Sequence, residues 1–461
     1  MGLTPPRVVV VGAGPAGTRA AERFAKAGLR PVVIDEGERQ GGQIYRRQPP
    51  HFTRPPEALY GTEATKATAL HRDFEALGDR IDYRPATLAW GARSGTLLTL
   101  RGDEAREVPY DALVIAAGAT DRIMPMPGWT LPGVYALGAA QIALKAQACA
   151  IGSAPVFIGT GPLLYLVAWQ YLKAGVRVRA VLDTSPFGRR LAALPQLAAR
   201  PGVLRQGLRY TAGLRRAGVP MATGVTPVGV LSRDGRAAGL LWRDASGRER
   251  TTEGDAVGFG YGLRSETQLA DLLKCDFAFD AVARQWLPVV DPEGRTSRAG
   301  VYLAGDGATV RGADAAEMAG RLAACAALAD LGRPVPAAEL DGLRAGLRPM
   351  ARFREGLEAA FPWPGYEAAG LPDETVVCRC ENVTAGEIRR AAREFGAPEL
   401  NRGKQLVRPG MGRCQGRVCG LAAAEILAAA RGVPVEQVGR LRGAAPIKPL
   451  PVGARLAEEA R

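Results

Sequence analysis

The segment Arg7-Val-Val-Val-Val-Gly-Ala-Gly-Pro-Ala-Gly17 gives the clearest indication of the chain's architecture. A short β-branched run leads directly into G-x-G-x-x-G, and a helical stretch follows over residues 18–27. The first glycine makes a tight turn, the second lets a pyrophosphate approach the backbone, and the third lets helix and strand pack closely. The helix N-terminus offers unpaired amides to phosphates. We predict a dinucleotide site whose first binding residues are Gly12, Gly14, Pro15, Ala16 and Gly17.

A carboxylate suited to a ribose follows the second expected strand. The run 31–34 is apolar and ends in Asp35-Glu36, with Asp35 18 residues after Gly17. An acid at this distance can accept hydrogen bonds from a ribose diol. With strand, helix and acid in register, the motif predicts a working nucleotide site, and we include Asp35 and Glu36 in it.

Three further segments resemble parts of flavoprotein reductases, and this resemblance implies FAD. The turn 41–45, with Gly42 and Gln43, is similar to the one that lies along FAD, and the strand 110–118 ends in Ala117-Gly118. The third segment, 300–307, carries Gly305 and Asp306, and the family aspartate bonds to the ribityl–pyrophosphate region. We expect a discontinuous FAD-binding domain, residues 1–130 and 266–335.

A second, weaker nucleotide motif lies between these parts, in an expected inserted dinucleotide-binding-like domain over residues 131–265. Strand 154–158 leads into Gly159-Thr-Gly161, then a helix, then an expected strand Val176–Leu182. Leu164 replaces the third glycine. Counted from the glycine that ends each helix, the acid's place falls on Leu182, one residue before Asp183. NAD(P), another adenine nucleotide and a purely structural repeat all remain open.

Four of the seven cysteines form two tight pairs near the carboxyl end, Cys378-Arg-Cys380 and Cys414-Gln-Gly-Arg-Val-Cys419. Four thiolates with small residues around them suit zinc or an iron–sulfur cluster. Structural zinc sites usually space paired ligands by two to four residues, unlike C-x-C. The pattern resembles the [2Fe–2S] domain related to bacterioferritin-associated ferredoxin, with Thr384 and Glu387 spaced as a capping box. We expect that domain over 373–435 and a tail over 436–461, with zinc or a disulfide pair as alternatives.

The three other cysteines, Cys149, Cys275 and Cys325, stand alone in apolar surroundings, and we expect them to be small buried hydrophobic residues.

Charge and hydropathy exclude several classes of function. The net charge is +14, but the arginines are spread along the chain without aromatic interleaving, so we expect no nucleic-acid partner. No apolar stretch approaches the ~20 residues of a membrane span, and no signal segment precedes the first strand. With reduced cysteines, these features predict a cytoplasmic protein. The arginine-rich stretch 189–216 is expected to be a solvated face, with a docking surface for an acidic protein as the alternative.

Taken together, the chain resembles the alpha subunits of bacterial heteromeric amino-acid dehydrogenases, a family that includes subunits of opine oxidase, D-hydroxyproline dehydrogenase and hydrogen cyanide synthase. The likeness covers nearly the whole chain, including 41–46, 159–164, 305–307 and 410–417. It implies an α/β fold: a flavoprotein with two dinucleotide-binding domains, Rossmann-like, plus a small α-rich [2Fe–2S] domain. Residues 336–372 are expected to connect the two parts.

The resemblance also implies a function. An alpha subunit with FAD and a [2Fe–2S] cluster would pass electrons from a beta subunit to an acceptor other than oxygen. The beta subunit would resemble D-amino-acid oxidases and carry its own flavin and the substrate site, for an opine, hydroxyproline or a related secondary amine. A small ferredoxin-like subunit is a further candidate partner in this hetero-oligomer.

Two other functions are weighed against this one, a self-sufficient NAD(P)H-dependent FAD/iron–sulfur reductase and a nucleotide-binding scaffold. The flavoprotein body contains no C-x-x-C motif of the kind that a thioredoxin-reductase-like enzyme needs. His51 and His71 are the only histidines, so no residue is assigned a catalytic role.

Overall fold

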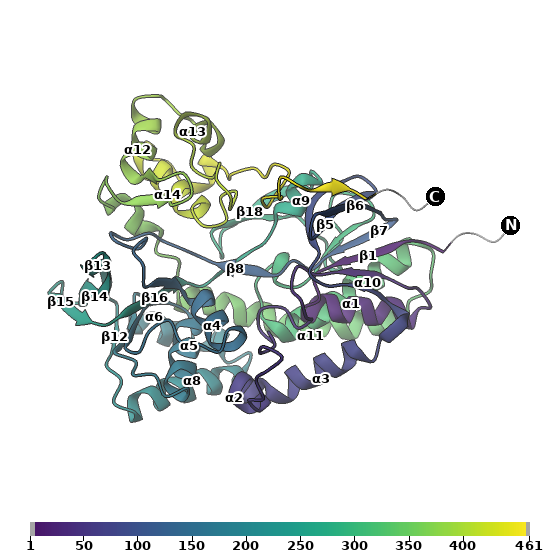
Figure 1. Ribbon diagram of the computed structural model, residues 1–461, viewed down its shortest axis with the longest axis horizontal. Helices are drawn as coiled ribbons and strands as arrows, with labels where there is room; N and C mark the ends of the chain where they lie inside the picture. The colour runs from purple at the N-terminus through teal and green to yellow at the C-terminus, as the bar shows by residue number, and fades with distance from the viewer. Residues whose placement is uncertain (1–4, 458–461) are drawn as a thin grey trace.

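The computed structural model describes residues 5–457, and the first glycine motif lies in a five-stranded parallel sheet (Figure 1). The strand order is β20-β7-β1-β2-β3. The strands are β1 (Val8–Val11), β2 (Val32–Ile34), β3 (Asp82–Arg84), β7 (Ala112–Ile115) and β20 (Val301–Leu303). Strands β1 and β7 are apolar and buried at every residue, as expected for parallel strands covered on both faces.

Different layers cover the two faces of this sheet. Val8 and Val10 pack with helices α1 (Pro15–Lys26) and α10 (Ala313–Asp330), whereas Val9 and Val11 face the antiparallel strands β4–β6. Helices α1 and α10 approach closely because Gly320 has no side chain: a Cβ there would lie 2.0 Å from the carbonyl oxygen of Ala16. The covering elements are β4 (Leu88–Arg93), β5 (Thr96–Arg101), β6 (Glu104–Pro109) and α3 (Ala64–Glu75).

A second five-stranded parallel sheet, of order β12-β11-β10-β16-β9, carries the second glycine motif. Its strands are β9 (Val134–Ala136), β10 (Pro155–Thr160), β11 (Ala180–Asp183), β12 (Met221–Thr223) and β16 (Ala256–Tyr261). Its helices are α4 (Leu137–Ala146), α5 (Pro162–Lys173), α6 (Phe187–Ala192), α7 (Leu194–Leu197) and α8 (Pro201–Arg216). The antiparallel strands β13 (Thr226–Arg233), β14 (Arg236–Arg243) and β15 (Glu249–Glu253) form a sheet beside it.

Two short strands connect the sheets. β8 (Ala119–Asp121) leaves the first sheet and β17 (Leu263–Ser265) returns to it, and the two pair antiparallel. Next come α9 (Gln268–Leu272) and the hairpin of β18 (Phe277–Asp280) and β19 (Gln285–Pro288). The short elements not yet named are α2 (Pro56–Tyr60), η1 (Gly61–Glu63), η2 (Gly78–Arg80) and η3 (Gly305–Gly307).

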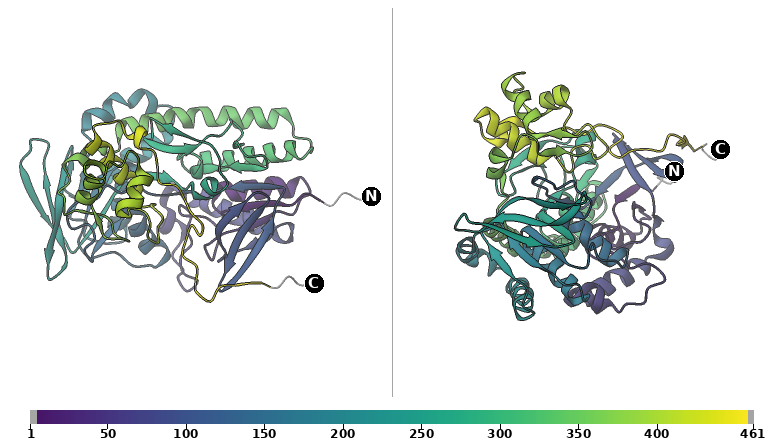
Figure 2. Two further views of the ribbon diagram at one scale, coloured as in Figure 1. Left: turned by 90° about the horizontal axis from the view of Figure 1, so that it is seen from above. Right: turned by 60° about the vertical axis from the view of Figure 1, so that its left-hand side comes forward.

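The long helix α11 (Ala337–Ala360) leads to a small unit that lies to one side of the two sheets (Figures 1 and 2). Its elements are η4 (Gly365–Gly370), β21 (Val376–Cys378), β22 (Val383–Thr384), α12 (Ala385–Arg393), α13 (Leu400–Val407), α14 (Gly420–Arg431) and η5 (Val435–Val438). The predicted capping box at the start of α12 is confirmed: Thr384 accepts from the Glu387 amide, and Glu387 accepts from the Thr384 amide.

The chain then returns to the flavoprotein body. The Ile447 amide donates to the carbonyl oxygen of Trp90 (2.9 Å), and the Ile447 side chain is buried. Strand β23 (Arg455–Leu456) pairs in parallel with β6. The expected tail is therefore packed against the first nucleotide-binding half, as the views in Figure 2 also show.

Two local predictions were wrong. Residues 176–179 are not strand, so β11 begins only at Ala180. Cys149 is exposed, because it lies in the loop between α4 and β10 at the surface, while Cys275 and Cys325 are buried as predicted. Within residues 5–457, no helix combines the length and apolar character needed to cross a bilayer.

Candidate flavin and cluster site

The first glycine turn leaves no space for side chains. Gly12 has φ +100°, and a Cβ there would lie 2.4 Å from the carbonyl oxygen of Ala116. A Cβ on Gly17 would lie 1.7 Å from the carbonyl oxygen of Gly12. Helix α1 therefore touches strand β1, and the turn backbone is open to a close-lying ligand.

Helix α1 begins at this turn without a side-chain cap. Gly14 is the N-cap residue and makes no capping hydrogen bond, and Pro15, which has no amide hydrogen, is the first helical residue. The amides of Ala16 and Gly17 belong to the first turn, where no intrahelical acceptor exists. This arrangement fits a phosphate group.

A second glycine turn packs against the first. A Cβ on Gly42 would lie only 2.9 Å from the Cα of Gly14, so the two turns are in backbone contact. Gln43 is exposed, and its side-chain oxygen accepts from Arg46 Nη2 (2.7 Å). The predicted residues of segment 41–45 therefore lie beside the phosphate-binding turn.

The predicted ribose acid lies at the same edge of the sheet. Asp35 follows β2 and accepts from the amides of Ala13 (2.5 Å) and Gly37 (2.7 Å). Burial raises the pKa of Asp35, although these two amides oppose the rise. Glu36 is exposed and pairs with Lys448 of the returning tail.

The last predicted residues follow β7 and β20. Ala117 and Gly118 follow β7; Gly118 has φ +72°, and no heavy atom lies within 4 Å of the position its Cβ would take. Gly305 and Asp306 follow β20, and Asp306 accepts from the amides of 311–312 (2.8 and 3.0 Å). Burial raises the pKa of Asp306.

All the predicted FAD residues thus meet where β1, β2, β7 and β20 end, or lie in the turn packed against that edge. Ligands of open α/β sheets bind in this crevice beyond the carboxyl ends of the strands. Two backbone turns without side chains, a helix N-terminus and two carboxylates fit a dinucleotide.

The four predicted cluster cysteines face one another across two loops. Cys378 and Cys419 are buried, while Cys380 and Cys414 are partly exposed. The Gly410 amide donates to Cys378 Sγ (3.5 Å). Gly412 is the glycine that lets the loops close, since a Cβ there would lie 2.2 Å from Cys380 Cβ.

The pKa shifts follow from this proximity. A hydrogen bond from the Cys419 thiol lowers the pKa of Cys378 to about 6. The same bond, with burial and the charges of the other three sulfurs, raises the pKa of Cys419. Burial raises the pKa of Cys380; a backbone hydrogen bond from Cys414 opposes this rise, while the charge of the Cys414 sulfur adds to it. The sulfurs therefore form two facing pairs, Cys378 with Cys419 and Cys380 with Cys414, and the charge of each pair affects the pKa of the other.

No three His, Cys, Asp or Glu side chains in the described part of the chain are arranged to hold one metal ion. A [2Fe–2S] cluster is held by four cysteine thiolates distributed over two irons. Two facing thiol pairs, closed by glycines and supplied with a backbone donor, fit that donor set.

The second cysteine loop docks on the flavoprotein body beside the crevice. Arg417 Nε donates to Glu266 Oε2 (2.5 Å), and both side chains are almost fully buried. The Glu266 amide donates to the carbonyl oxygen of Gly118 (3.0 Å). Burial alone would raise the pKa of Glu266, but the charges of Arg417 and Arg264 hold it below its ordinary value. One side-chain ion pair and one backbone hydrogen bond therefore connect the cysteine loop to the segment Ala117–Gly118 after β7, which we call the flavin element.

Further contacts secure this docking. Arg264 Nη1 donates to the carbonyl oxygen of Arg417 (2.9 Å), and Gln268 Nε2 donates to that of Gln415 (2.8 Å). Arg440 makes two bonds of 2.8 Å to Asp271.

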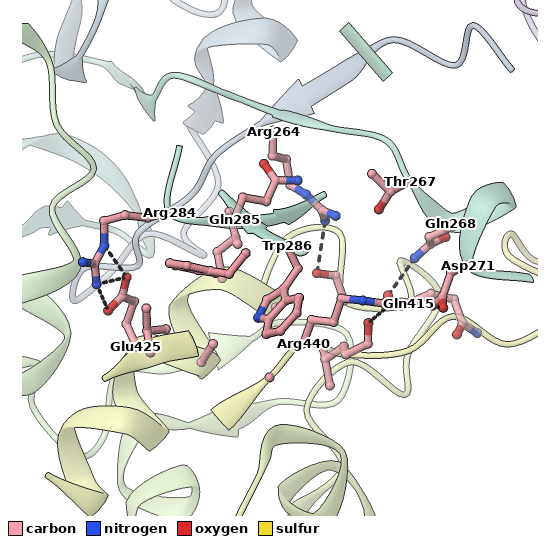
Figure 3. Close-up of a pocket in the computed structure, with 18 residues that line it drawn as sticks. Arg264, Thr267, Gln268, Asp271, Arg284, Gln285, Trp286, Gln415, Glu425 and Arg440 are labelled. Atoms are coloured by element: carbon pink, nitrogen blue, oxygen red, sulfur yellow. Dashed lines mark hydrogen bonds and ion pairs between the residues drawn. The ribbon is translucent and has the colours of Figure 1, made fainter. Parts of the chain in front are cut away.

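A cavity of about 60 Å³ lies between the two units (Figure 3). Arg264, Gln268 and Trp286 line it, and each has a buried polar atom without a hydrogen-bond partner in the described chain. Arg284 lies at the other side and forms an ion pair with Glu425 (3.0 Å). The cavity has room for a few water molecules and not for a nucleotide.

The second glycine motif has its acid in the nucleotide-binding register, which corrects the prediction made by counting. In the second sheet, Asp183 lies opposite Gly159, the first glycine of the motif. In the first sheet, Val11 pairs with Ile34, so the next residues, Gly12 and Asp35, stand in the same relation. The count from helix ends placed the acid at Leu182 because the connection before β11 is one residue longer.

Asp183 is nevertheless occupied by protein groups. It accepts from Thr160 Oγ1 (2.9 Å), Tyr165 Oη (2.8 Å) and the Ser185 amide (2.7 Å), and it pairs with Arg190 (2.5 Å). The side chain is fully buried, and burial raises its pKa. A ribose would have to displace these partners.

The connector after α11 lies over the same end of the second sheet. The Ser185 hydroxyl donates to the carbonyl oxygen of Ala360 (2.5 Å), and the Arg190 guanidinium stacks on Phe361 (5.1 Å). Trp363 packs edge-on against Tyr261, the last residue of β16 (6.1 Å). Residues of the connector therefore cover the end of the second sheet where a nucleotide would bind.

Sequence reasoning missed Arg264, Glu266 and the role of Arg417. Arg417 lies between Cys414 and Cys419 in the cysteine motif. A charged side chain in a loop of small residues could have suggested a carboxylate partner in another part of the chain. Arg264 and Glu266 lie in no recognisable motif, and their place depends on the return of β17 to the first sheet.

Comparison with protein families matches two parts of the chain. Residues 6–323 match the pyridine nucleotide-disulphide oxidoreductase model, and residues 376–429 match the BFD-like [2Fe-2S] binding domain.

Curated relatives cover nearly the whole chain. The A subunit of opine oxidase from Rhizobium meliloti is 40% identical over 98% of this chain and 87% of its own length. Hydrogen cyanide synthase subunit HcnB of Pseudomonas aeruginosa is 34% identical over 97% of this chain and 98% of its own length. Among solved structures, L-proline dehydrogenase from P. horikoshii has the same fold, with a TM-score of 0.68 and 19% identity over 98% of this chain and 79% of that one.

Proposed function

Because the chain belongs to the pyridine nucleotide-disulphide oxidoreductase family, in the group with HcnB and the opine oxidase relative, we propose that it is the electron-transfer subunit of a hetero-oligomeric amino-acid or imino-acid dehydrogenase. It is an FAD oxidoreductase with a [2Fe–2S] domain. In this role it takes electrons from a flavoprotein partner and passes them to an acceptor other than oxygen.

The docking of the cysteine loop on the flavin element carries this proposal. Arg417 bonds to Glu266, whose amide bonds to Gly118. Electron transfer between the two cofactors requires the cluster loop to lie close to the flavin-binding residues, and this docking supports that requirement. When bound, FAD would accept two electrons at once and release them one at a time, and the cluster would take them singly, so together they would split a two-electron oxidation.

The residues have separate parts in this function. The turns at Gly12–Gly17 and Gly42–Gln43, with Ala117–Gly118 and Gly305–Asp306, would bind FAD, and Asp35 and Glu36 would lie toward its ribose. The cluster ligands would be Cys378, Cys380, Cys414 and Cys419.

The substrate would bind to the partner. The curated relatives are named as subunits. We propose a beta subunit resembling D-amino-acid oxidases, with its own flavin. A further candidate component is a small ferredoxin-like subunit.

The test is to purify the chain alone and with the flavoprotein encoded beside it, then to assay dye reduction with imino acids and secondary amino acids. The proposal predicts bound FAD and iron in both preparations, but turnover only when the partner is present. Full turnover by the chain alone would contradict it.

The register of Asp183 favours a second candidate, an NAD(P)H-dependent reductase. The partners that occupy Asp183 and the connector over the crevice weigh against it. Anaerobic titration with NADH or NADPH distinguishes the two functions: the electron-transfer subunit keeps an oxidised flavin spectrum, whereas the reductase bleaches within seconds.

A further inference from the structure

Two arginines hold the backbone of the second cysteine loop. Arg264, on β17 of the flavoprotein body, donates from Nη1 to the carbonyl oxygens of Arg417 (2.9 Å) and Gly416 (3.5 Å). Arg417 donates from Nη1 to the carbonyl oxygens of Ile447 (2.7 Å) and Cys414 (3.4 Å). Both guanidinium groups therefore bind loop atoms between Cys414 and Cys419, or next to them.

The charge around this loop is not balanced. Glu266 forms an ion pair with Arg417. It feels the charge of Arg264 but forms no hydrogen bond with that side chain in the described chain. Arg264 also has its Nε buried without a hydrogen-bond partner within residues 5–457. Two other acids, Asp271 and Glu381, are paired with arginines of their own. Among Arg264, Arg417 and Glu266, two guanidiniums and one carboxylate leave an excess of about one positive charge, because guanidinium does not lose its proton in proteins.

We propose that Arg264 and Arg417 position the cysteine loop against the flavin element and raise the reduction potential of the cluster that the loop binds, with Glu266 as their partial counter-charge. The proposal rests on the function given above, in which the four cysteines carry a [2Fe–2S] cluster.

The physical reason is electrostatic. Gaining one electron makes the cluster more negative by one charge, and a nearby cation stabilises that charge most when water is excluded. The side chains of Arg417 and Glu266 are only 11% and 13% exposed, so solvent screens them weakly. Removing a positive charge should therefore lower the reduction potential of the cluster, and removing the negative charge of Glu266 should raise it.

Glu266 also contacts the flavin element. Glu266 connects the loop to Gly118 through its backbone amide (3.0 Å), so a change in this ion pair reaches both cofactor sites. A higher cluster potential favours electron flow from FAD toward the cluster.

The experiment is a redox titration of the cluster by electron paramagnetic resonance in the full-length holoprotein. Arg264→Gln is expected to lower the potential, and Glu266→Gln to raise it, each by about a tenfold change in the equilibrium for electron gain, or about 59 mV for one electron. Arg264→Lys, which keeps the charge, should restore most of the wild-type value.

Arg284→Gln is the matched control. Arg284 also bridges the two units, but its side chain bonds to Glu425 on α14 and to no atom of the cysteine loop within residues 5–457, so the potential should stay within a twofold change. Shifts of the same sign in Arg264→Gln and Glu266→Gln, no shift in either, or an equal shift in the control would overturn the proposal.

Loss of the cluster in Arg264→Gln leaves the decision to Glu266→Gln, which changes few atoms: a rise supports the proposal and an unchanged potential refutes it. Wild-type protein that contains no iron would instead refute the proposed function. The two failures are therefore distinguishable.

Discussion

Gly17 shows how strictly single residues control the flavin site. It lies inside helix α1, where alanine would ordinarily be favoured, yet a Cβ there would lie 1.7 Å from the carbonyl oxygen of Gly12. The helix would have to move off strand β1, and the turn that faces the phosphates would move with it.

Gly17→Ala should therefore lower the flavin-to-protein ratio and destabilise the fold by about 1–3 kcal/mol, as overpacking does. Absorbance at 450 nm and urea unfolding measure the two effects. Gly207→Ala is the control, since Gly207 is also helical and no heavy atom lies within 4 Å of its Cβ position. It should keep all its flavin and gain up to about 1 kcal/mol. Normal flavin content and stability in Gly17→Ala would contradict this reading of the turn.

Glu367 is a half-buried acid whose ionisation opposes folding. Burial raises its pKa to about 8, and its Oε1 has no hydrogen-bond partner in the part of the chain described. The unfolded chain ionises near 4.5, so between these values the folded state binds the extra proton and stability falls as pH rises.

Glu367→Gln should remove this pH dependence. Relative to wild type, the variant should gain at most about 3 kcal/mol at pH 7 and little at pH 4.5. Chemical denaturation of both proteins at several pH values gives the difference. An equal difference at all pH values would show that Glu367 is not the titrating group.

At the scale of elements, helix α12 depends on its capping box. Thr384→Ala removes the acceptor for the Glu387 amide and should cost about 1 kcal/mol, seen as earlier loss of cluster absorbance in denaturant. Thr211→Ala is the control, because Thr211 lies inside α8 and bonds only to preceding carbonyls, so it should cost nothing. Equal losses in both variants would rule out a capping effect.

Elements with a local chemical cause were predictable from sequence. The buried strand β1, the glycine turn and the capping box each follow from a few adjacent residues. The register of β11 was not predictable, because it depends on how many residues the irregular connection 176–179 uses. Cys149 shows the same limit: apolar neighbours in sequence did not place it in a core.

At the scale of the whole molecule, the chain leaves the first sheet and returns to it twice. β17 brings Arg264 and Glu266 to the end of β7, and the carboxyl-terminal segment brings Ile447 back under β4 and β5. Both returns contact the second cysteine loop, since Glu266 pairs with Arg417 and the carbonyl oxygen of Ile447 accepts from Arg417. The contacts of Arg417 with Glu266 and Arg264 join residues more than 150 positions apart, which no local pattern encodes.

We propose that flavin and cluster lie in one chain and exchange electrons there. The decisive measurement is anaerobic photoreduction of the purified chain, with flavin absorbance and the paramagnetic signal of the cluster followed together. We predict that the reduced cluster signal of a [2Fe–2S] centre grows in as electrons enter through FAD, without any partner subunit. Protein that holds zinc in place of iron and sulfide, or a cluster that stays oxidised while the flavin is fully reduced, would contradict the account.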